Sequence, residues 1–175
     1  TFSEITTAAQ LTIDDNADGA STGATRSGGI TTSAEVNIST QWITDYGTGL
    51  NTYSFQTYLH EIGHALGLGH SGDYNGEGTY ATDAAYLNDS WATTVMSYFD
   101  QLENTYFNAQ GFTKQFVVSP LVSDILALTQ LYGAATTTRT GDTRYGFGNT
   151  SGRAIYDAAT YTNITYTVID HGGGD

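Results

Sequence analysis

Three of the four histidines in this chain of 175 residues lie in one stretch of eleven residues, HEIGHALGLGH, from His60 to His70. His60 and His64 are four positions apart, and on a helix this spacing puts both imidazoles on one face, where they can bind a single ion. Glu61 projects about 100° away by the helical period, so its carboxylate can reach a water molecule on that ion without binding the ion itself. These residues predict a metal centre with a general base beside it.

A third ligand requires the helix to end, because the sixth position after His64 no longer faces the same side. Gly67 allows this, since glycine accepts a positive φ and lets the chain turn back to bring His70 to the ion. Three neutral imidazoles with an open fourth position are typical of a catalytic zinc site. The chain has no cysteine, so thiolate ligands are excluded. A histidine pair at this spacing is more often exposed or hydrogen-bonded, but Gly67 and His70 at the required offsets make an accidental match improbable.

Two helices are predicted to support this site. The first covers residues 52–66, where apolar side chains recur at the helical period, and Gly67 ends it. The second lies in SPLVSDILALTQLYG, with Ser119 as N-cap, Pro120 at the first helical position and Gly133 just past the end. Residues 71–94 are rich in turn formers and predict a long loop, which in a compact domain is usually either functional or held in place by other contacts.

Strands are expected at the N-terminal end, in TFSEI, QLTID and ITTSAEVNIS, with the stretch DDNADGASTGATRSGG as a loop between them. After Ala135 the chain becomes rich in Thr, Gly and Asn, and it ends in DHGGGD, which looks like the opening of a glycine-aspartate repeat array. We therefore expect a boundary near Ala135.

The balance of acidic and basic residues indicates which classes of partner the surface favours. With 18 acidic and 5 basic residues, the formal net charge is −13. A negative surface disfavours nucleic acids and anionic membranes and favours metal cations. No run approaches the roughly 18 apolar residues of a membrane span. The first ten residues have neither the basic start nor the apolar region of a signal peptide, so the protein is cytoplasmic, has lost its signal, or is exported by another route.

The histidine stretch, followed by Met96 in TVMSYF, resembles the metzincin metalloproteases. The finer similarity is to the serralysins, zinc endopeptidases of bacterial calcium-binding-repeat exoproteins. Over residues 60–175 it rests on segments that occur in serralysin order, namely HEIGHALGLGH, GDYNGEG, VMSYF, SDILALTQLYGA, TRTGDTRYGF and VIDHGGGD. The first 50 residues resemble the family only loosely.

The resemblance implies an α+β fold. Residues 1–135 would form a metzincin catalytic domain with a mixed twisted sheet, an active-site helix and a second helix. Residues 136–175 would begin a calcium-binding parallel β-roll. A helix that serralysins carry before the first strand is not found in these residues, and the remaining repeats and the export signal would follow Asp175.

The resemblance also assigns roles to the site residues. Glu61 would activate the attacking water, Tyr98 would be a displaceable fifth zinc ligand that stabilises the oxyanion, and Met96 would form an apolar floor. The zinc ligands would be His60, His64 and His70.

A calcium site is implied by an R-T-G-D-T piece and a D-x-G-G-x-D piece, whose oxygen donors suit this ion. Without the resemblance, such glycine-aspartate clusters would be read as turns. The residues are Arg139, Gly141, Thr143, Asp170, Gly172, Gly173 and Asp175.

The function implied is that of a secreted, extracellular zinc endopeptidase of broad specificity. Its partners would be extended polypeptide substrates, a proteinaceous inhibitor and the remainder of the exoprotease. Metzincins commonly bind substrate as an added strand, and residues 30–39 are the candidate edge for it.

Two alternatives remain open. One is a catalytically inactive zinc- and calcium-binding fragment, which the intact Glu61 disfavours because a binding module needs no general base. The other is a matrixin-like peptidase of narrow specificity. Ser71 favours this second alternative, since serralysins usually carry proline there, but Tyr98 disfavours it.

Overall fold

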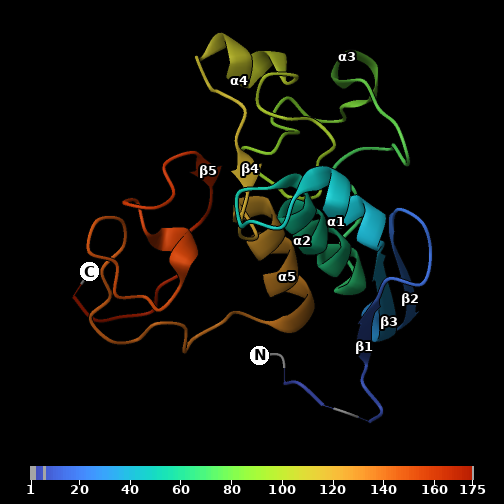
Figure 1. The fold of residues 1–175 in the computed structure, drawn as a ribbon, viewed down its shortest axis with the longest axis horizontal. Coiled ribbons are helices and arrows are strands. Elements are labelled where there is room, and N and C mark those ends of the chain that lie inside the picture. The colour runs from blue at the N-terminus through green and yellow to red at the C-terminus, as the bar shows by residue number, and fades with distance from the viewer. Residues whose placement is uncertain (1–2, 6, 175) are drawn as a thin grey trace.

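The computed structural model describes residues 3–5 and 7–174 and is mixed α and β, with a small mixed sheet beside the helices (Figure 1). The elements follow in the order β1 (Leu11–Asp14), β2 (Ala20–Ser27), β3 (Ile30–Ile38), α1 (Thr40–Tyr46), α2 (Tyr53–Ala65), α3 (Tyr80–Asp83), α4 (Thr105–Ala109), β4 (Phe116–Val117), α5 (Val122–Tyr132), the 3-10 helix η1 (Ala154–Tyr156) and β5 (Ile164–Thr165).

The sheet has the order β1-β3-β2, with β1 parallel and β2 antiparallel to β3. β3 is therefore the central strand, and the prediction that residues 30–39 form the edge was wrong. In the part of the chain that is described, the edge strands are β1 and β2, and β2 lies in a segment predicted to be a loop. The strand was missed because its residues, ASTGATRS, are small and polar and contain few strand formers.

The turn between β2 and β3 was the signal that could have revealed the edge strand. Gly28 and Gly29 have φ values of 58° and 83°. Two consecutive residues with positive φ are typical of a two-residue hairpin turn, because such a turn matches the twist of the strands it joins. A Gly-Gly pair before an alternating segment is thus a hairpin signal.

Helix α2 lies between two apolar cores and so holds its residues in a fixed place. The core on the sheet side contains Ala34, Val36, Ile38 and Ala65. The core on the other side contains Leu68, Trp91, Val95, Met96, Val117 and Leu121, with residues of α5 packed against it. Figure 1 shows α2 in the middle of the molecule, with the sheet on one side and α5 on the other.

The predicted ends of α2 are confirmed. The Thr52 side chain accepts the N–H of Phe55 at the start of the helix, and Gly67 has φ 101° just after its end. Because only glycine adopts this φ without strain, the chain can leave the helix axis there.

The predicted start of α5 was wrong. The helix begins at Val122 and its N-cap is Leu121, because the Asp124 carboxylate accepts the Leu121 N–H at 2.7 Å. Ser119 is used elsewhere, since its hydroxyl accepts the N–H of Thr167 at 2.9 Å. The end of the helix at Gly133, which has φ 83°, is as predicted.

Other parts of the chain differ from expectation. Residues 3–5 of TFSEI form no strand, whereas QLTID contains β1, and the short helices α1, α3 and α4 were not predicted. The two-residue strand β5 pairs in parallel with β4, so the segment after Ala135 packs on the preceding part of the chain. The described residues of this segment do not show a β-roll, so the β-roll and the domain boundary at residue 135 stay predictions.

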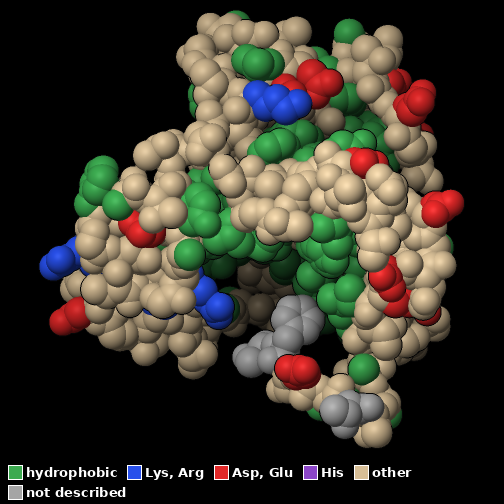
Figure 2. Space-filling model, in the orientation of Figure 1, with side chains coloured by type: hydrophobic (Ala, Val, Ile, Leu, Met, Phe, Trp, Pro, Cys, Tyr) green, Lys and Arg blue, Asp and Glu red, His purple; other side chains and the backbone are tan. Residues whose placement is uncertain are grey.

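The surface carries the negative charge that the composition predicts. On the face shown in Figure 2, acidic side chains are spread over the sheet and the α3 side of the molecule. No helix formed by the described residues has both the length and the apolar character that a membrane span needs.

Candidate metal centre

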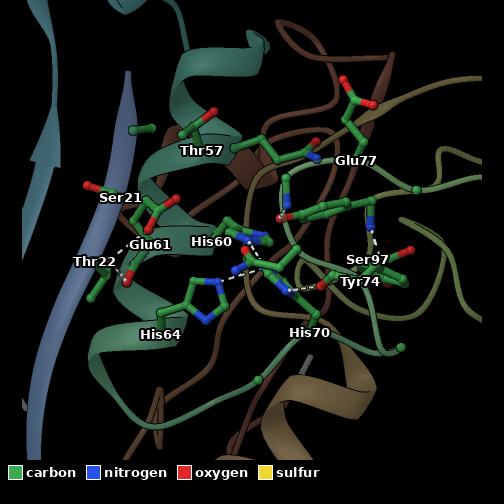
Figure 3. Close-up of a pocket in the computed structure, with 18 of the residues that line it drawn as sticks. Ser21, Thr22, Thr57, His60, Glu61, His64, His70, Tyr74, Glu77 and Ser97 are labelled. Carbon is green, nitrogen blue, oxygen red and sulfur yellow. Dashed lines mark hydrogen bonds between the residues drawn. The ribbon is translucent and has the colours of Figure 1, made fainter. Parts of the chain in front are cut away.

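The structure brings the three histidines together at one point. His60 and His64 project from α2, and His70 reaches them from the chain that turns back after Gly67 (Figure 3). The Nε2 atom of His70 lies 3.2 Å from that of His60 and 3.0 Å from that of His64. Within the described residues, these are the only three ligand-type side chains with ligand atoms this close together, all within 4.8 Å.

A backbone carbonyl fixes each imidazole ring. The Nδ1–carbonyl pairs are His60 with Val95 at 2.9 Å, His64 with Leu68 at 2.9 Å, and His70 with Tyr74 at 2.7 Å. A carbonyl oxygen only accepts, so in each pair Nδ1 must carry the proton and Nε2 must keep its lone pair. Three lone pairs that face one another repel unless a cation lies between them. The donor set therefore fits a metal ion, and the carbonyls are the outer partners that orient such ligands.

The surroundings also keep the imidazoles of His60 and His70 neutral. Burial lowers the pKa of His60 from 6.5 to about 4, against a hydrogen bond to the Val95 carbonyl that acts in the opposite direction. Burial, followed by the charge of His64, lowers the pKa of His70. Both rings are therefore unprotonated at neutral pH, as metal binding requires.

Met96 packs directly against α2 between the first two histidines. It is 2 % exposed, and a Cβ atom added to Gly63 would lie 2.5 Å from its sulfur. Glycine at position 63 is thus what lets the helix approach the methionine. This contact is compatible with the predicted floor beneath the histidines.

The turn that contains Met96 is tied to α5 by one buried carboxylate. Asp124 accepts the Thr94 hydroxyl at 2.5 Å, the Val95 N–H at 3.0 Å and the Leu121 N–H at 2.7 Å. Because the Val95 carbonyl orients His60, Asp124 connects the start of α5 to the metal centre.

Glu61 lies on the β2 side of the histidines (Figure 3), where it lines the same cleft, and it is 7 % exposed. The Thr22 hydroxyl lies 2.7 Å from Glu61 Oε2 and 2.9 Å from the Glu61 carbonyl oxygen, so it donates to both from the edge strand. Burial raises the pKa of Glu61, and the Thr22 hydrogen bond and His64 partly offset the rise. Sequence reasoning missed Thr22 because its segment was expected to be a loop.

Tyr98 lies beside the histidines. Its ring centroid is 4.5 Å from that of His70, and its hydroxyl oxygen accepts the N–H of Gly76 at 3.1 Å. The predicted role of Tyr98 as a fifth ligand stays a prediction.

The histidines and Glu61 line a large open cleft. Its volume is about 1410 Å³, and β2, α2 and the segment 72–79 form its walls. Arg26, on β2, donates to the His64 carbonyl at 2.8 Å and joins this wall to the end of α2. An open cleft beside a sheet edge can accommodate an extended chain.

The two glycine-aspartate segments predicted to bind calcium lie against each other. A Cβ atom added to Gly173 would overlap the Gly141 backbone, so the two chains are in close contact there. Asp142 Oδ1 accepts the Gly174 N–H at 2.7 Å, and Arg139 has the unusual φ of 50°. The structure thus brings together residues about 30 positions apart in the chain.

The remaining predicted calcium residues are in the same region, with one exception. Asp170 accepts the Tyr145 hydroxyl and, at 3.0 Å, the Gly172 N–H. Thr143 is buried and donates to a carbonyl of its own turn at 3.0 Å. Asp175 lies outside the described residues.

Comparisons with known proteins identify relatives of this chain. The model of metallopeptidase family M12B, reprolysin-like, matches residues 5–125. The chain is 43% identical over 130 residues to the metallopeptidase AprA of Pseudomonas marginalis, covering 72% of this chain and 27% of the relative. It is 45% identical over 148 residues to the metalloprotease AprA of Pseudomonas entomophila, covering 80% of this chain and 29% of the relative. It is 40% identical over 144 residues to a serralysin of a Photorhabdus species, covering 79% of this chain and 29% of the relative.

The chain therefore spans less than a third of the length of these relatives. The matching family model covers the segment that holds the sheet, α2 and the histidines, and the relatives carry the names metallopeptidase, metalloprotease and serralysin. On these grounds the chain belongs to the metallopeptidases, and among them to the serralysin-type metzincins.

Proposed function

We propose that this chain carries the catalytic site of a zinc endopeptidase that hydrolyses peptide bonds in extended polypeptides. One observation carries the proposal above the others. Three imidazole nitrogens with free lone pairs converge beside a buried carboxylate, in an open cleft of about 1410 Å³. Membership of the serralysin type supports the same reaction.

His60, His64 and His70 would hold the zinc ion. When bound there, zinc would polarise the scissile carbonyl and lower the pKa of a water molecule toward neutrality. Glu61 would accept a proton from that water and pass it to the leaving amine, and Thr22 would hold the carboxylate in position for both steps. The Tyr98 oxygen accepts the N–H of Gly76, and its own proton would donate to the developing oxyanion.

The substrate would lie along β2 as an added strand. In the described part of the chain, β2 pairs only with β3, so its other edge can bond to a peptide backbone. Backbone pairing does not depend on the substrate side chains. The expected specificity is therefore broad, whereas a narrow matrixin-like peptidase would also need a pocket that selects the substrate side chain.

The test uses the chain loaded with zinc and calcium on a reduced and alkylated protein substrate. Glu61→Gln should reduce cleavage by about 10²-fold or more, since it removes the general base, and should retain bound zinc. Glu35→Gln, a matched change at an exposed residue of β3, should leave cleavage as it is. A parent chain that binds zinc and does not cleave would favour the inactive fragment instead.

We also propose that the segments 139–143 and 170–175 bind calcium, as the beginning of a β-roll. Their close contact and oxygen-rich composition support this. Calcium should raise the unfolding temperature of the parent chain, and Asp170→Asn should diminish the rise. Asp18→Asn, at an exposed residue far along the chain, is the control. An equal rise in all three proteins would count against the site.

The proposal also covers the location of the protein and its partners. As a serralysin-type protease, the protein would act outside the cell, and a proteinaceous inhibitor is a further expected partner. The negative surface does not favour nucleic acids.

A further inference from the structure

Asp89 is a buried carboxylate that the proposed mechanism does not use. It is 2 % exposed, and its neighbours hold its backbone firmly. The side-chain amide of Asn104, itself fully buried, donates to the Asp89 carbonyl at 2.8 Å. The Asp89 N–H donates to the Tyr86 carbonyl at 3.1 Å. Asp89 is therefore a fixed point in the molecule.

The Asp89 carboxylate accepts hydrogen bonds from two hydroxyl groups. Tyr74 donates to its two oxygens at 3.0 and 3.1 Å, and Ser71 donates to Oδ1. The two hydroxyl oxygens also lie 2.7 Å from each other. A buried carboxylate requires such partners, because leaving it without hydrogen bonds would cost much free energy.

Both hydroxyl groups belong to residues that place His70. Ser71 follows His70 directly in the chain. Tyr74 supplies the carbonyl that fixes His70 Nδ1 at 2.7 Å, and its ring stacks on the His70 ring with centroids 5.6 Å apart and an interplanar angle of 25°. Figure 3 shows Tyr74 and His70 next to each other at the side of the cleft opposite α2.

The need for such an anchor follows from the path of the chain. His60 and His64 are held by the rigid α2, whereas His70 lies in a segment without helix or strand. Gly72 within this segment has no room for a side chain, since an added Cβ would lie 2.5 Å from the Tyr74 ring. The segment is folded tightly over the tyrosine, so the position of the tyrosine determines the position of the histidine.

We propose that Asp89 is a positioning residue for the metal centre, which holds His70 in its binding orientation through Ser71 and Tyr74. The proposal rests on the proposed zinc site. Removing the Asp89 hydrogen bonds should loosen the third ligand while the other two stay in place. The Tyr98 N–H, which lies 3.4 Å from the same Tyr74 hydroxyl, would be affected with it.

The experiment measures zinc affinity by competition with a chromophoric chelator, for the full chain in the presence of calcium. Asp89→Asn should weaken zinc binding about 10- to 100-fold, the usual effect of losing an outer partner of a ligating histidine. Asp15→Asn removes the same charge from an exposed residue outside the cleft and is the matched control, which should change the affinity less than about twofold. The visible spectrum of the cobalt-substituted protein should change in Asp89→Asn and stay unchanged in the control.

Further variants separate positioning from general stability. Tyr74→Phe keeps the ring and the carbonyl but loses the hydroxyl, and it should weaken zinc binding in the same direction as Asp89→Asn. The double variant should lose little more than Asp89→Asn alone, because both changes break one connection. If Asp89→Asn does not fold, Tyr74→Phe and Ser71→Ala decide the question.

The outcomes are distinct. The proposal would be overturned if folded Asp89→Asn, or Tyr74→Phe, had the zinc affinity and the cobalt spectrum of the parent. A loss of stability in the metal-free protein without a loss of zinc affinity would do the same. A parent chain that fails to bind zinc would instead overturn the proposed function itself.

Discussion

Replacing Gly63 by alanine tests how closely α2 approaches the methionine turn. The added Cβ would lie 2.5 Å from the Met96 sulfur, whereas carbon atoms in ordinary contact are about 3.5–4.0 Å apart. One of the two groups must therefore move by about 1 Å. Met96 is 2 % exposed and has core residues around it, so the movement is resisted.

The expected cost combines two opposing terms. Overpacking a core typically destabilises by about 1–3 kcal/mol. Alanine in place of a helical glycine stabilises by about 1 kcal/mol. The net loss for Gly63→Ala is then about 0–2 kcal/mol, which by itself does not identify the contact. A double-mutant cycle with Met96→Ala isolates the term due to the contact.

The cycle has a definite expected result. Met96→Ala alone should cost about 2–5 kcal/mol. In the Gly63→Ala background it should cost less by about 1–3 kcal/mol, because truncating the methionine relieves the clash. Urea unfolding of the metal-free chain, followed by circular dichroism, measures all four proteins without a contribution from bound metal. Effects that add within about 0.5 kcal/mol would refute the close approach.

Three further predictions follow from hydrogen bonds of the structure. Thr22→Val should lower kcat/KM about tenfold. It should also move the acid limb of the pH–rate profile to higher pH, because losing the Thr22 hydrogen bond raises the pKa of Glu61, the general base. An acid limb at the parental pH would contradict the role of Thr22. Asp124→Ala should reduce the free energy of unfolding by about 3–5 kcal/mol, because three buried donors lose their acceptor, and chemical denaturation should detect this. Burial raises the pKa of Asp100, but the hydrogen bonds from Lys114, 2.8 Å away, and from backbone N–H groups outweigh it and lower the pKa below 3.8. The charged Asp100 therefore stabilises the fold above about pH 4, and this contribution is lost as the pH falls through the lowered pKa. The difference in free energy of unfolding between the parent and Asp100→Asn should shrink in acid. A difference that stays constant with pH would argue against this contribution.

The metal-binding stretch was predictable because its geometry is local. His60, His64 and Glu61 are placed by the helical period alone, and Gly67 ends the helix through its own backbone freedom. Both facts depend on residues within one helix and its end, so no distant contact was needed to predict them. The end of α5 at Gly133 was predictable for the same reason.

The strand order could not be predicted in this way. Both β2 and β3 can pair on either edge as isolated segments, and only the hairpin and the parallel pairing with β1 place β3 in the centre. The start of α5 likewise depends on Asp124, whose carboxylate serves the methionine turn and the helix at once. Such choices are settled by contacts between distant parts of the chain, which no local pattern contains.

The sequence by itself determined the identity of the converging ligands, because residue type and helical spacing are enough to bring imidazoles to one ion. Only the tertiary structure decided what supports them. Thr22 reaches Glu61 from 39 positions away, and Val95 orients His60 from 35 positions away. Asp89 lies 18 positions from Ser71. These partners are chosen by packing, since a buried polar group must find its hydrogen bond wherever the fold brings a donor or acceptor within reach.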